Sequence, residues 1–542
     1  MKSRLSCVLL ISLAIQACGG GNRSTPPAAP PEPSTPVVTN PEAPPTSVIS
    51  NYIGFESAPV RPIVQQGNWL YVTNTPNNTV EAFELDETGS AQARFSIPVG
   101  LEPISLAMES LDKLWVVNHL SDSVSVIDLG LSIPVVTRTL LVGDEPQDIV
   151  FAKGKAFIST AHRGQHLDHP SLIGVPGAGD PQLHTPSIGR ADVWVFDPAN
   201  LGNAIGGIPQ KIISLFGDSP RSLAVSNDES HVYVAVYHSG NQTTAVHEAV
   251  ICQGFEDDEL GENPCRVMDG ITSPNGIENG WLPGGRTAPG QNAEGEFQPW
   301  TSMIVQYEPQ SGQWQDSQGR NFSNGIRFNL PDNDVFAIDT STLNEDGAYQ
   351  HVGTTLFNLA VHPVTDTLFS TNTEANNAVR FEGSGEHGGS TVQGNIARSQ
   401  ISLIAPDTGN VRIRPINRHI DYSQLKASPS VKEHSLSTPT QMQFSNDGSE
   451  LFVATIGSNK VARFNVSELT DDALWDDEDQ EFSPTQASQS HINVEGGPVG
   501  IHLNSDNNKL YVFTRFDNVL VTFDTETGLE LQRISMATPE PE

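Results

Sequence analysis

The sequence predicts an all-β fold, a seven-bladed β-propeller, on the basis of three observations. An apolar strand phrase whose second residue is aromatic returns seven times along the 542 residues. A proline precedes most copies at a nearly constant distance, and a polar turn with an alternating strand follows the clearest ones. Many copies of one supersecondary unit indicate a repeat fold. A radial arrangement of such units leaves only short, protected strand edges.

The strand phrase is most complete at Leu70-Tyr-Val-Thr-Asn74, which is followed by the turn at 78–80 and an alternating strand at 82–85. It recurs at 114–118, 156–160, 232–236, 368–372, 451–455 and 510–514. The prolines that stand 11 to 13 positions before the aromatic residue are Pro59, Pro103, Pro146, Pro220, Pro439 and Pro498. Leu356 takes that place in the remaining copy. Because proline cannot donate to a strand ladder, each one predicts the beginning of an innermost strand.

The ring must also close. Six of the seven innermost-strand signals, five prolines and Leu356, follow Tyr71 in the sequence. The seventh signal, Pro59, precedes Tyr71, so one strand must come from the N-terminal side. We therefore expect the strand at 58–64 to complete the sheet that begins at Leu510 and ends near Ile534, so that the N-terminal and C-terminal strands pair. An open β-solenoid is the alternative, and long, uneven inserts fit it poorly.

The N-terminus is typical of an export signal. Residues 1–4 are basic, 7–15 are apolar, and Ile15-Gln-Ala-Cys18 is typical of a cleavage site. The apolar stretch is too short to span a bilayer. A cysteine directly after Ala17 resembles the lipobox of bacterial lipoproteins. This implies removal of residues 1–17, lipidation of Cys18 and an outer-membrane lipoprotein facing the periplasm or the cell surface. Plain secretion is the alternative.

Residues 18–50 are rich in glycine and then in proline, which predicts an extended tether before a propeller at 51–538. Cys252 and Cys265 lie in one insert and are expected to form a disulfide in an oxidising compartment. The sequence contains no C-x-x-C-H segment, so we expect no covalent haem c on this chain.

The formal net charge of −35 argues against nucleic acid and anionic lipid as partners, so we expect membrane contact only through the lipid anchor. Acidic runs at 256–262 and 471–481 match no EF-hand loop. They are expected to be solvated loops, with weak calcium binding as the alternative.

Successive aromatic positions are 44 and 42 residues apart in the first blades and 76, 136 and 83 apart later. Inserts near 164–190, 247–300 and 383–400 therefore elaborate the third, fourth and fifth blades. Long loops on a rigid scaffold carry binding functions. We expect a protein or small-molecule ligand at this loop face.

The pairing of Tyr-Val-Thr-Asn with Asn-Thr-Val at 70–80, and its variant at 114–127, resembles the YVTN family of β-propeller repeats. Five further phrases are similar to the propeller half of bacterial proteins that join such a propeller to a dihaem peroxidase-like cytochrome c. They begin at Ala161, Gly189, His238, Asp334 and His419. In those fusions the haem domain follows the last blade, near where this sequence ends. The resemblance therefore implies a chain that either never had a haem domain or is a truncated or split version, with a separate cytochrome c or other redox protein as the expected partner.

His119, His162 and His238 follow the aromatic residues of three consecutive blades by four or five positions. Imidazoles that converge at one end of the ring can bind copper, zinc or iron, and Arg163 or Arg221 can bind an anion nearby. Histidines that hydrogen-bond within loops are the alternative, because no close metal-binding spacing such as H-E-x-x-H is present.

These features favour a tethered binding or scaffold module without catalytic residues. The alternative is a metal-binding propeller, either a carrier or a metalloenzyme, that uses the histidine face. A lactone- or sugar-processing propeller rests on analogy of fold alone.

Overall fold

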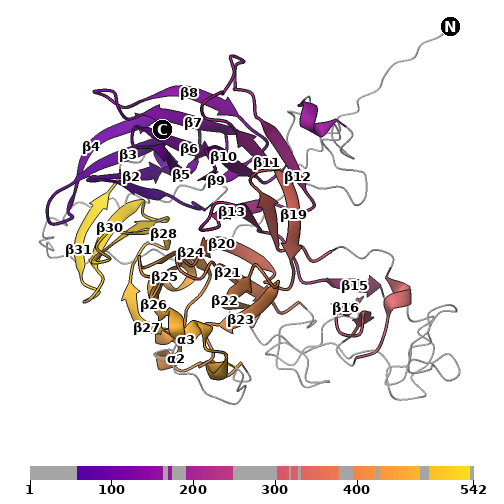
Figure 1. The fold of residues 1–542 in the computed structure, drawn as a ribbon. Helices are drawn as coiled ribbons and strands as arrows, with labels where there is room; N and C mark the ends of the chain where they lie inside the picture. Colours follow the sequence, from indigo (N-terminus) through magenta and orange to yellow (C-terminus); the bar gives the residue numbers. More distant parts are fainter. Residues whose placement is uncertain are drawn as a thin grey trace, which may run out of the picture. The chain divides into compact units, whose positions relative to one another are not determined.

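The computed structural model describes residues 58–162, 169–173, 191–247, 302–316, 319–326, 331–377, 395–422, 427–475 and 488–536. All of these belong to one compact unit, Asn51–Glu542. Within it, seven four-stranded antiparallel sheets follow one another around a ring (Figure 1). The predicted seven-bladed β-propeller is therefore confirmed.

The first four blades come in chain order. Blade 1 contains β1 (Ile63–Gln66), β2 (Trp69–Asn74), β3 (Thr79–Leu85) and β4 (Ala91–Pro98). Blade 2 contains β5 (Pro103–Ser110), β6 (Lys113–Asn118), β7 (Ser123–Asp128) and β8 (Val135–Leu141). Blade 3 contains β9 (Pro146–Ala152), β10 (Lys155–Thr160), β11 (Ala191–Phe196) and β12 (Lys211–Leu215). Blade 4 contains β13 (Pro220–Val225), β14 (His231–Val236), β18 (Val335–Asp339) and β19 (Asn344–Tyr349).

The last three blades complete the ring. Blade 5 contains β20 (Thr355–Val361), β21 (Leu368–Ala375), β22 (Ala397–Ala405) and β23 (Asn410–Pro415). Blade 6 contains β24 (Pro439–Phe444), β25 (Glu450–Thr455), β26 (Lys460–Asn465) and β27 (Ser488–Asn493). Blade 7 contains β28 (Pro498–Leu503), β29 (Lys509–Thr514), β30 (Val519–Asp524) and β31 (Glu530–Ser535). Two short helices, α2 (Pro429–His434) and α3 (Val466–Thr470), flank blade 6.

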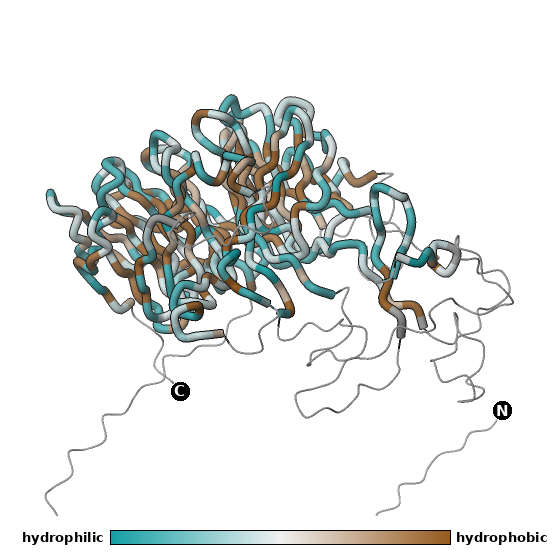
Figure 2. The backbone as a smooth tube through the Cα atoms, turned by 90° about the horizontal axis from the view of Figure 1, so that it is seen from below, coloured by the Kyte–Doolittle hydropathy of each residue, from teal (hydrophilic) through white to brown (hydrophobic). Residues whose placement is uncertain are grey.

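All seven copies of the strand phrase form the second strand of a blade, and these strands are buried along almost their whole length. A strand covered on both faces by neighbouring sheets reads as a continuous apolar run. The outermost strands instead alternate between exposed and partly buried residues, as in β8 and β31. Figure 2 shows the same division, with apolar strand centres and hydrophilic turns.

The fourth-blade insert contains a small sheet that the sequence did not predict. Between β14 and β18 the chain forms β15 (Thr243–His247), β16 (Ser302–Glu308) and β17 (Gln313–Gln315), which pair in that order. The predicted inserts near 164–190, 247–300 and 383–400 fall mostly outside the described residues, as does the tether before residue 51.

Polar bonds join the innermost strands of neighbouring blades. In blades 2 to 7 the register with the second strand shifts near the start of the innermost strand, as at a β-bulge. Just beyond most of these shifts, a backbone N–H of the innermost strand donates to an acceptor in the preceding blade and not to a strand of its own sheet. The pairs are Leu106 N to Arg61 O (2.9 Å), Leu223 N to Asp148 Oδ2 (2.9 Å), Leu359 N to Ser222 Oγ (3.1 Å), Met442 N to Asn358 Oδ1 (3.3 Å) and Ile501 N to Gln441 Oε1 (2.9 Å). Blades 2 and 3 are joined by Ser105 Oγ, which donates to Asp148 Oδ1 at 2.6 Å.

The expected closure by strand exchange is wrong. The strand β1 pairs with β2 across the two-residue turn at Gly67 and Asn68, and blade 7 has its own innermost strand, β28. The β1–β2 hairpin forms instead of a sheet that joins β1 to the C-terminal strands, because closing a two-residue turn has a far smaller entropic cost than joining the two ends of the chain. Blades 1 and 7 are nevertheless neighbours. The Tyr511 hydroxyl donates to Gly89 O at 2.9 Å, and the Gln532 amide bonds both backbone groups of Ala91.

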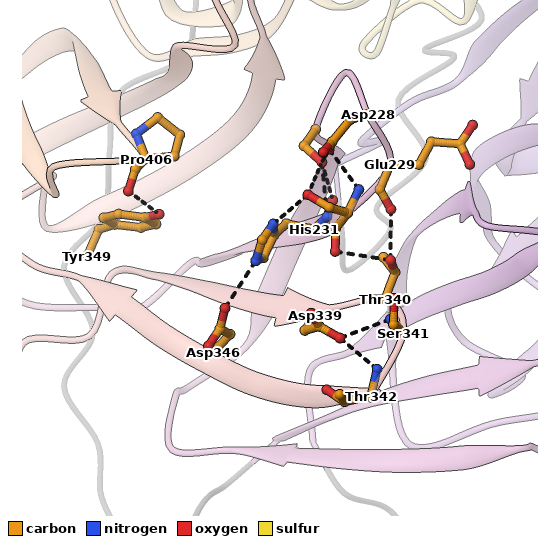
Figure 3. Close-up of polar contacts among 12 residues, drawn as sticks. Asp228, Glu229, His231, Asp339, Thr340, Ser341, Thr342, Asp346, Tyr349 and Pro406 are labelled. Carbon is orange, nitrogen blue, oxygen red and sulfur yellow. Dashed lines mark hydrogen bonds and ion pairs between the residues drawn. The ribbon is translucent and has the colours of Figure 1, made fainter.

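Two turns between first and second strands use an aspartate to bond their own backbone. Asp228 accepts from Ser226 Oγ at 2.9 Å and Ser230 N at 2.8 Å, and Asp447 repeats the arrangement with Ser445 and Ser449. The bonds from the serines lower the pKa of each aspartate to about 2. Figure 3 shows Asp228 at the tip of its turn and His231, which reaches Asp346 of β19 at 3.1 Å.

The low pKa of Asp228 and Asp447 predicts an acid-sensitive contribution to stability. Because the folded pKa is about 2 and the ordinary value is 3.8, the contribution is present above pH 3.8 and is lost as the pH falls toward 2. We expect the Asp228→Ala/Asp447→Ala double variant to lose part of this pH dependence in urea unfolding at pH 2 to 6. The exposed Asp112→Ala is the control, and an equal flattening there would contradict the prediction.

The inter-blade bonds predict that Asn358→Ala destabilises the fold. Asn358 is buried, accepts from Met442 N and donates to Ser222 Oγ at 3.1 Å. Leaving a buried N–H without an acceptor costs about 1–3 kcal/mol. The free energy of urea unfolding should fall by this amount, whereas Asn410→Ala, on an exposed outer position, should change it little. Equal effects of the two substitutions would contradict this account.

Candidate functional site

One end of the central channel is built by two repeated backbone positions. The residue before the first proline of an innermost strand has a positive φ of 52° at Glu102 and Glu145, and of 60° at Ser219. The carbonyl oxygens of these residues accept the N–H of the residue after the second strand, which is His119, Ala161 and Tyr237 respectively. Blades 6 and 7 repeat this bond between Thr438 and Ile456 and between Gly497 and Arg515. The residue after each second strand is thereby fixed at the rim of the channel.

These positions surround a cavity of about 430 Å³, which we call the channel mouth. Its lining combines cationic, aromatic and small polar side chains, with Glu145 as the acidic member. The residues are Ala58, His119, Glu145, Gln147, Ala161, Ser219, Arg221, Tyr237, His238, Phe357, Thr438, Thr440, Ile456 and Arg515. The mouth is thus a cationic site on a chain of strongly negative net charge.

Arg221 forms the floor of the mouth and is 7% exposed. Its guanidinium donates to Ala58 O at 2.7 Å and to Gln147 Oε1 at 3.3 Å, and it lies 5.2 Å from the centre of the Tyr237 ring. Burial is the main cause that lowers the pKa of Arg221 to about 10, and the neighbouring charge of Arg515 acts in the same direction. The side chain remains a cation at neutral pH, held near a second cation.

Of the three histidines predicted to converge, His119 and His238 line the channel mouth, and His162 lies against Glu145, which lines it. His119 is buried, and its Nδ1 lies 3.3 Å from Pro146 O and 3.4 Å from the Gln147 amide nitrogen. The Nδ1 of His162 lies 3.6 Å from Glu145 Oε2, and that of His238 lies 3.8 Å from Asp218 Oδ1. The nearby His238 side chain is the main cause of the lowered pKa of Asp218.

The described residues contain no set of ligands that would support the predicted metal site. Among them, no group of three or more His, Cys, Asp or Glu side chains is arranged to hold a metal ion. His169, in the same blade as His162, caps a short turn and bonds Ser171 and Pro209 O. The predicted site residues Arg163, Cys18, Cys252 and Cys265 lie outside the described residues.

Several residues of the mouth escaped the sequence analysis. Tyr237 and Arg515 follow their second strands directly, as His119 does, so the repeat phase that singled out His119 could have found them. Gln147 likewise follows Pro146 as Arg221 follows Pro220. Phe357 comes from blade 5, where no proline marks the position. None of these side chains belongs to a residue type that commonly binds metal, so the histidine pattern alone does not indicate them.

No helix among the described residues is long and apolar enough to cross a bilayer.

The fold and the mouth define a seven-bladed β-propeller with a polar site at one end of its channel. The family described as lactonase, 7-bladed beta-propeller, matches residues 358–540, which cover blades 5 to 7. No curated protein matches the sequence significantly.

Solved structures resemble the chain at low sequence identity. Hydrazine synthase of Kuenenia stuttgartiensis has a TM-score of 0.52 at 14% identity, with 88% of this chain and 99% of that chain covered. A putative 6-phosphogluconolactonase of Bacteroides uniformis ATCC 8492 has a TM-score of 0.39 at 10% identity, covering 75% and 79%. A functionally unknown protein of Desulfotomaculum acetoxidans DSM 771 has a TM-score of 0.42 at 12% identity, with 86% of this chain and 96% of that chain covered. The first of these similarities shows the fold alone. The YVTN resemblance and the lipidation of Cys18 stay predictions.

Proposed function

We propose that the protein is an envelope-tethered binding module whose channel mouth takes a small carboxylate-bearing ligand. The observation that carries this proposal is that two cationic side chains, Arg221 and Arg515, line one cavity, where the charge of Arg515 contributes to the lowered pKa of Arg221. A carboxylate bound in this cavity would be stabilised by both positive charges and would accept charge-assisted hydrogen bonds from the guanidinium groups. The rings of Tyr237 and Phe357 offer apolar walls for the rest of the ligand.

The overall charge of the protein sharpens this selectivity. A net charge of −35 repels anions from most of the surface, so only a site with local positive charge retains one. Export and tethering through Cys18 belong to the same proposal and rest on the signal sequence and the proline-rich segment at 18–50. A separate cytochrome c or other protein partner stays a prediction.

The proposal predicts that Arg515→Gln weakens binding of gluconate about ten- to hundredfold, because a hydrogen bond to a charged group contributes roughly 1.5–3 kcal/mol. Isothermal titration calorimetry measures this, with sorbitol as a ligand of similar size that lacks the carboxylate. Arg94→Gln is the matched control, since Arg94 pairs with Glu84 on the outside of blade 1. Absence of saturable heat with gluconate, or equal weakening by the two substitutions, would reject the proposal.

A second candidate is hydrolysis of a lactone at the same mouth, favoured by the family match over residues 358–540. Glu145 lines the mouth and lies against His162, so the pair could take a proton from an attacking water. The guanidinium groups of Arg221 and Arg515 would stabilise the oxyanion that forms.

Lactone hydrolysis predicts that Glu145→Gln lowers kcat for glucono-δ-lactone about a hundredfold or more, as expected for loss of a general base. A pH-stat assay measures the acid released, with Arg94→Gln as the variant expected to keep full activity. A wild-type rate no faster than spontaneous hydrolysis would leave binding as the function of the mouth.

A further inference from the structure

A second cavity lies where blade 4, blade 5 and the small sheet β15–β17 meet. It has a volume of about 290 Å³, and its lining includes Asn241, Gln306, Tyr307, Asp332, Asp334 and Glu374. We call it the acid-pair cavity.

The chain leaving β14 is bonded along the edge of blade 5, which fixes one wall of this cavity. Ser239 Oγ donates to Gly353 O at 2.6 Å, Gly240 N donates to Thr354 O at 3.1 Å, and the Asn241 amide donates to Glu374 Oε1 at 2.7 Å. These bonds lie outside the channel mouth, so the two sites are distinct.

Two aspartates just before β18 are each held by one oxygen. Asp334 Oδ2 accepts from Val352 N at 2.6 Å and from Gly353 N at 3.3 Å, and the residue is fully buried. Asp332 is 3% exposed, and its Oδ2 accepts from His351 N at 3.1 Å and lies 2.9 Å from His351 Nδ1. The backbone and His351 thus fix the orientation of both carboxyl groups.

The remaining oxygens are buried acceptors without donors. In the part of the chain that the structure describes, Asp332 Oδ1, Asp334 Oδ1 and Asn241 Oδ1 are buried without a well-aligned donor, and all three residues line the acid-pair cavity. The Ser239 hydroxyl lies near enough to Asp334 to lower its pKa, but it donates to Gly353 O. Burial raises the pKa of both aspartates, and repulsion from Asp332 raises that of Asp334 further. Burial also raises the pKa of Glu374. A buried acceptor left unsatisfied is unfavourable, so this arrangement suits a ligand that supplies donors and positive charge.

We propose that the acid-pair cavity binds the primary ammonium group of a small amine. An ammonium group carries three N–H donors and no acceptor, which matches the three oxygens of Asp332, Asp334 and Asn241. The Tyr307 ring and Ile413 line the same cavity and can contact the carbon skeleton of the amine. An organic cation fits better than a metal ion, because no group of three or more His, Cys, Asp or Glu side chains within the described ranges is arranged for one.

A proton shared between Asp332 and Asp334 is the competing explanation, since the two carboxyl groups are close enough to bond through one. The Asp334→Asn variant distinguishes the shared proton from a bound ammonium group. Its amide oxygen can keep the bonds from Val352 and Gly353, and its NH₂ can donate to Asp332. The variant should therefore unfold at the same or a higher urea concentration than the wild type while losing the charge and the acceptor that an ammonium needs.

The test is calorimetric titration of the whole purified chain with methylammonium chloride at constant ionic strength. Tetramethylammonium chloride, which has no N–H donor, and calcium chloride are titrated in parallel. We expect saturable binding of methylammonium alone, and affinity about tenfold or more lower in Asp334→Asn. Asp346→Asn, an exposed aspartate on β19 that pairs with His231, should bind as the wild type does.

Three outcomes would overturn the proposal. The first is no saturable binding of methylammonium to the wild type, which leaves the shared proton as the account of the acid pair. The second is equal binding of tetramethylammonium, which makes the N–H donors irrelevant. The third is tighter binding of calcium than of methylammonium, which makes the cavity a metal site.

Discussion

The hydrogen bond from the innermost strand of one blade to a polar group of the preceding blade is the interaction on which the ring depends. An innermost strand is an edge strand, and its outward N–H groups have no strand partner. Water can satisfy such groups only where the channel is open. A bulge near the start of the strand turns an N–H toward the neighbour, and Asp148, Ser222, Asn358 and Gln441 accept it. Apolar packing alone would hold the blades together without fixing their register.

The same bonds position the channel mouth. Asp148 lies beside Gln147, which bonds Arg221, and it accepts from Leu223, two residues beyond Arg221. Ser159 Oγ also donates to Arg221 O at 3.2 Å, which ties blade 3 to blade 4 at this level. A buried guanidinium costs less to orient when the strands on both sides are already fixed. The rigidity of the ring therefore becomes pre-organisation of the cationic floor.

Much of the ring was predictable because its repeat has a short period. The aromatic strand phrase and the proline spacing are local signals. Every copy of the phrase lies in the second strand of a blade, and every proline of the set except Pro59 begins an innermost strand. The predicted closure is wrong because it pairs the strand before Trp69 with the far end of the chain, although the turn at Gly67 and Asn68 indicates a hairpin. The repeat also predicts that His119 and Arg221 lie at the same end of the ring, because His119 directly follows a second strand and Arg221 stands near the start of an innermost strand.

The acid-pair cavity lay beyond sequence reasoning for a different reason. Asp332 and Asp334 meet Asn241 only because an insert leaves blade 4 along the edge of blade 5 and returns to it. No periodic signal in the sequence connects these positions. Which carboxylate oxygens lack a donor depends on the backbone N–H groups of Val352 and Gly353, whose positions only the folded structure gives. Convergence of this kind depends on tertiary packing.

Amide hydrogen exchange, resolved at single residues, tests the central claim most directly. The backbone amides of Leu223, Leu359, Met442 and Ile501 lie on the open edge of their sheets, yet each donates to the preceding blade. The account predicts that they exchange as slowly as the amides of the buried second strands. Exchange as fast as that of the outermost strands, such as β8 and β31, would contradict it.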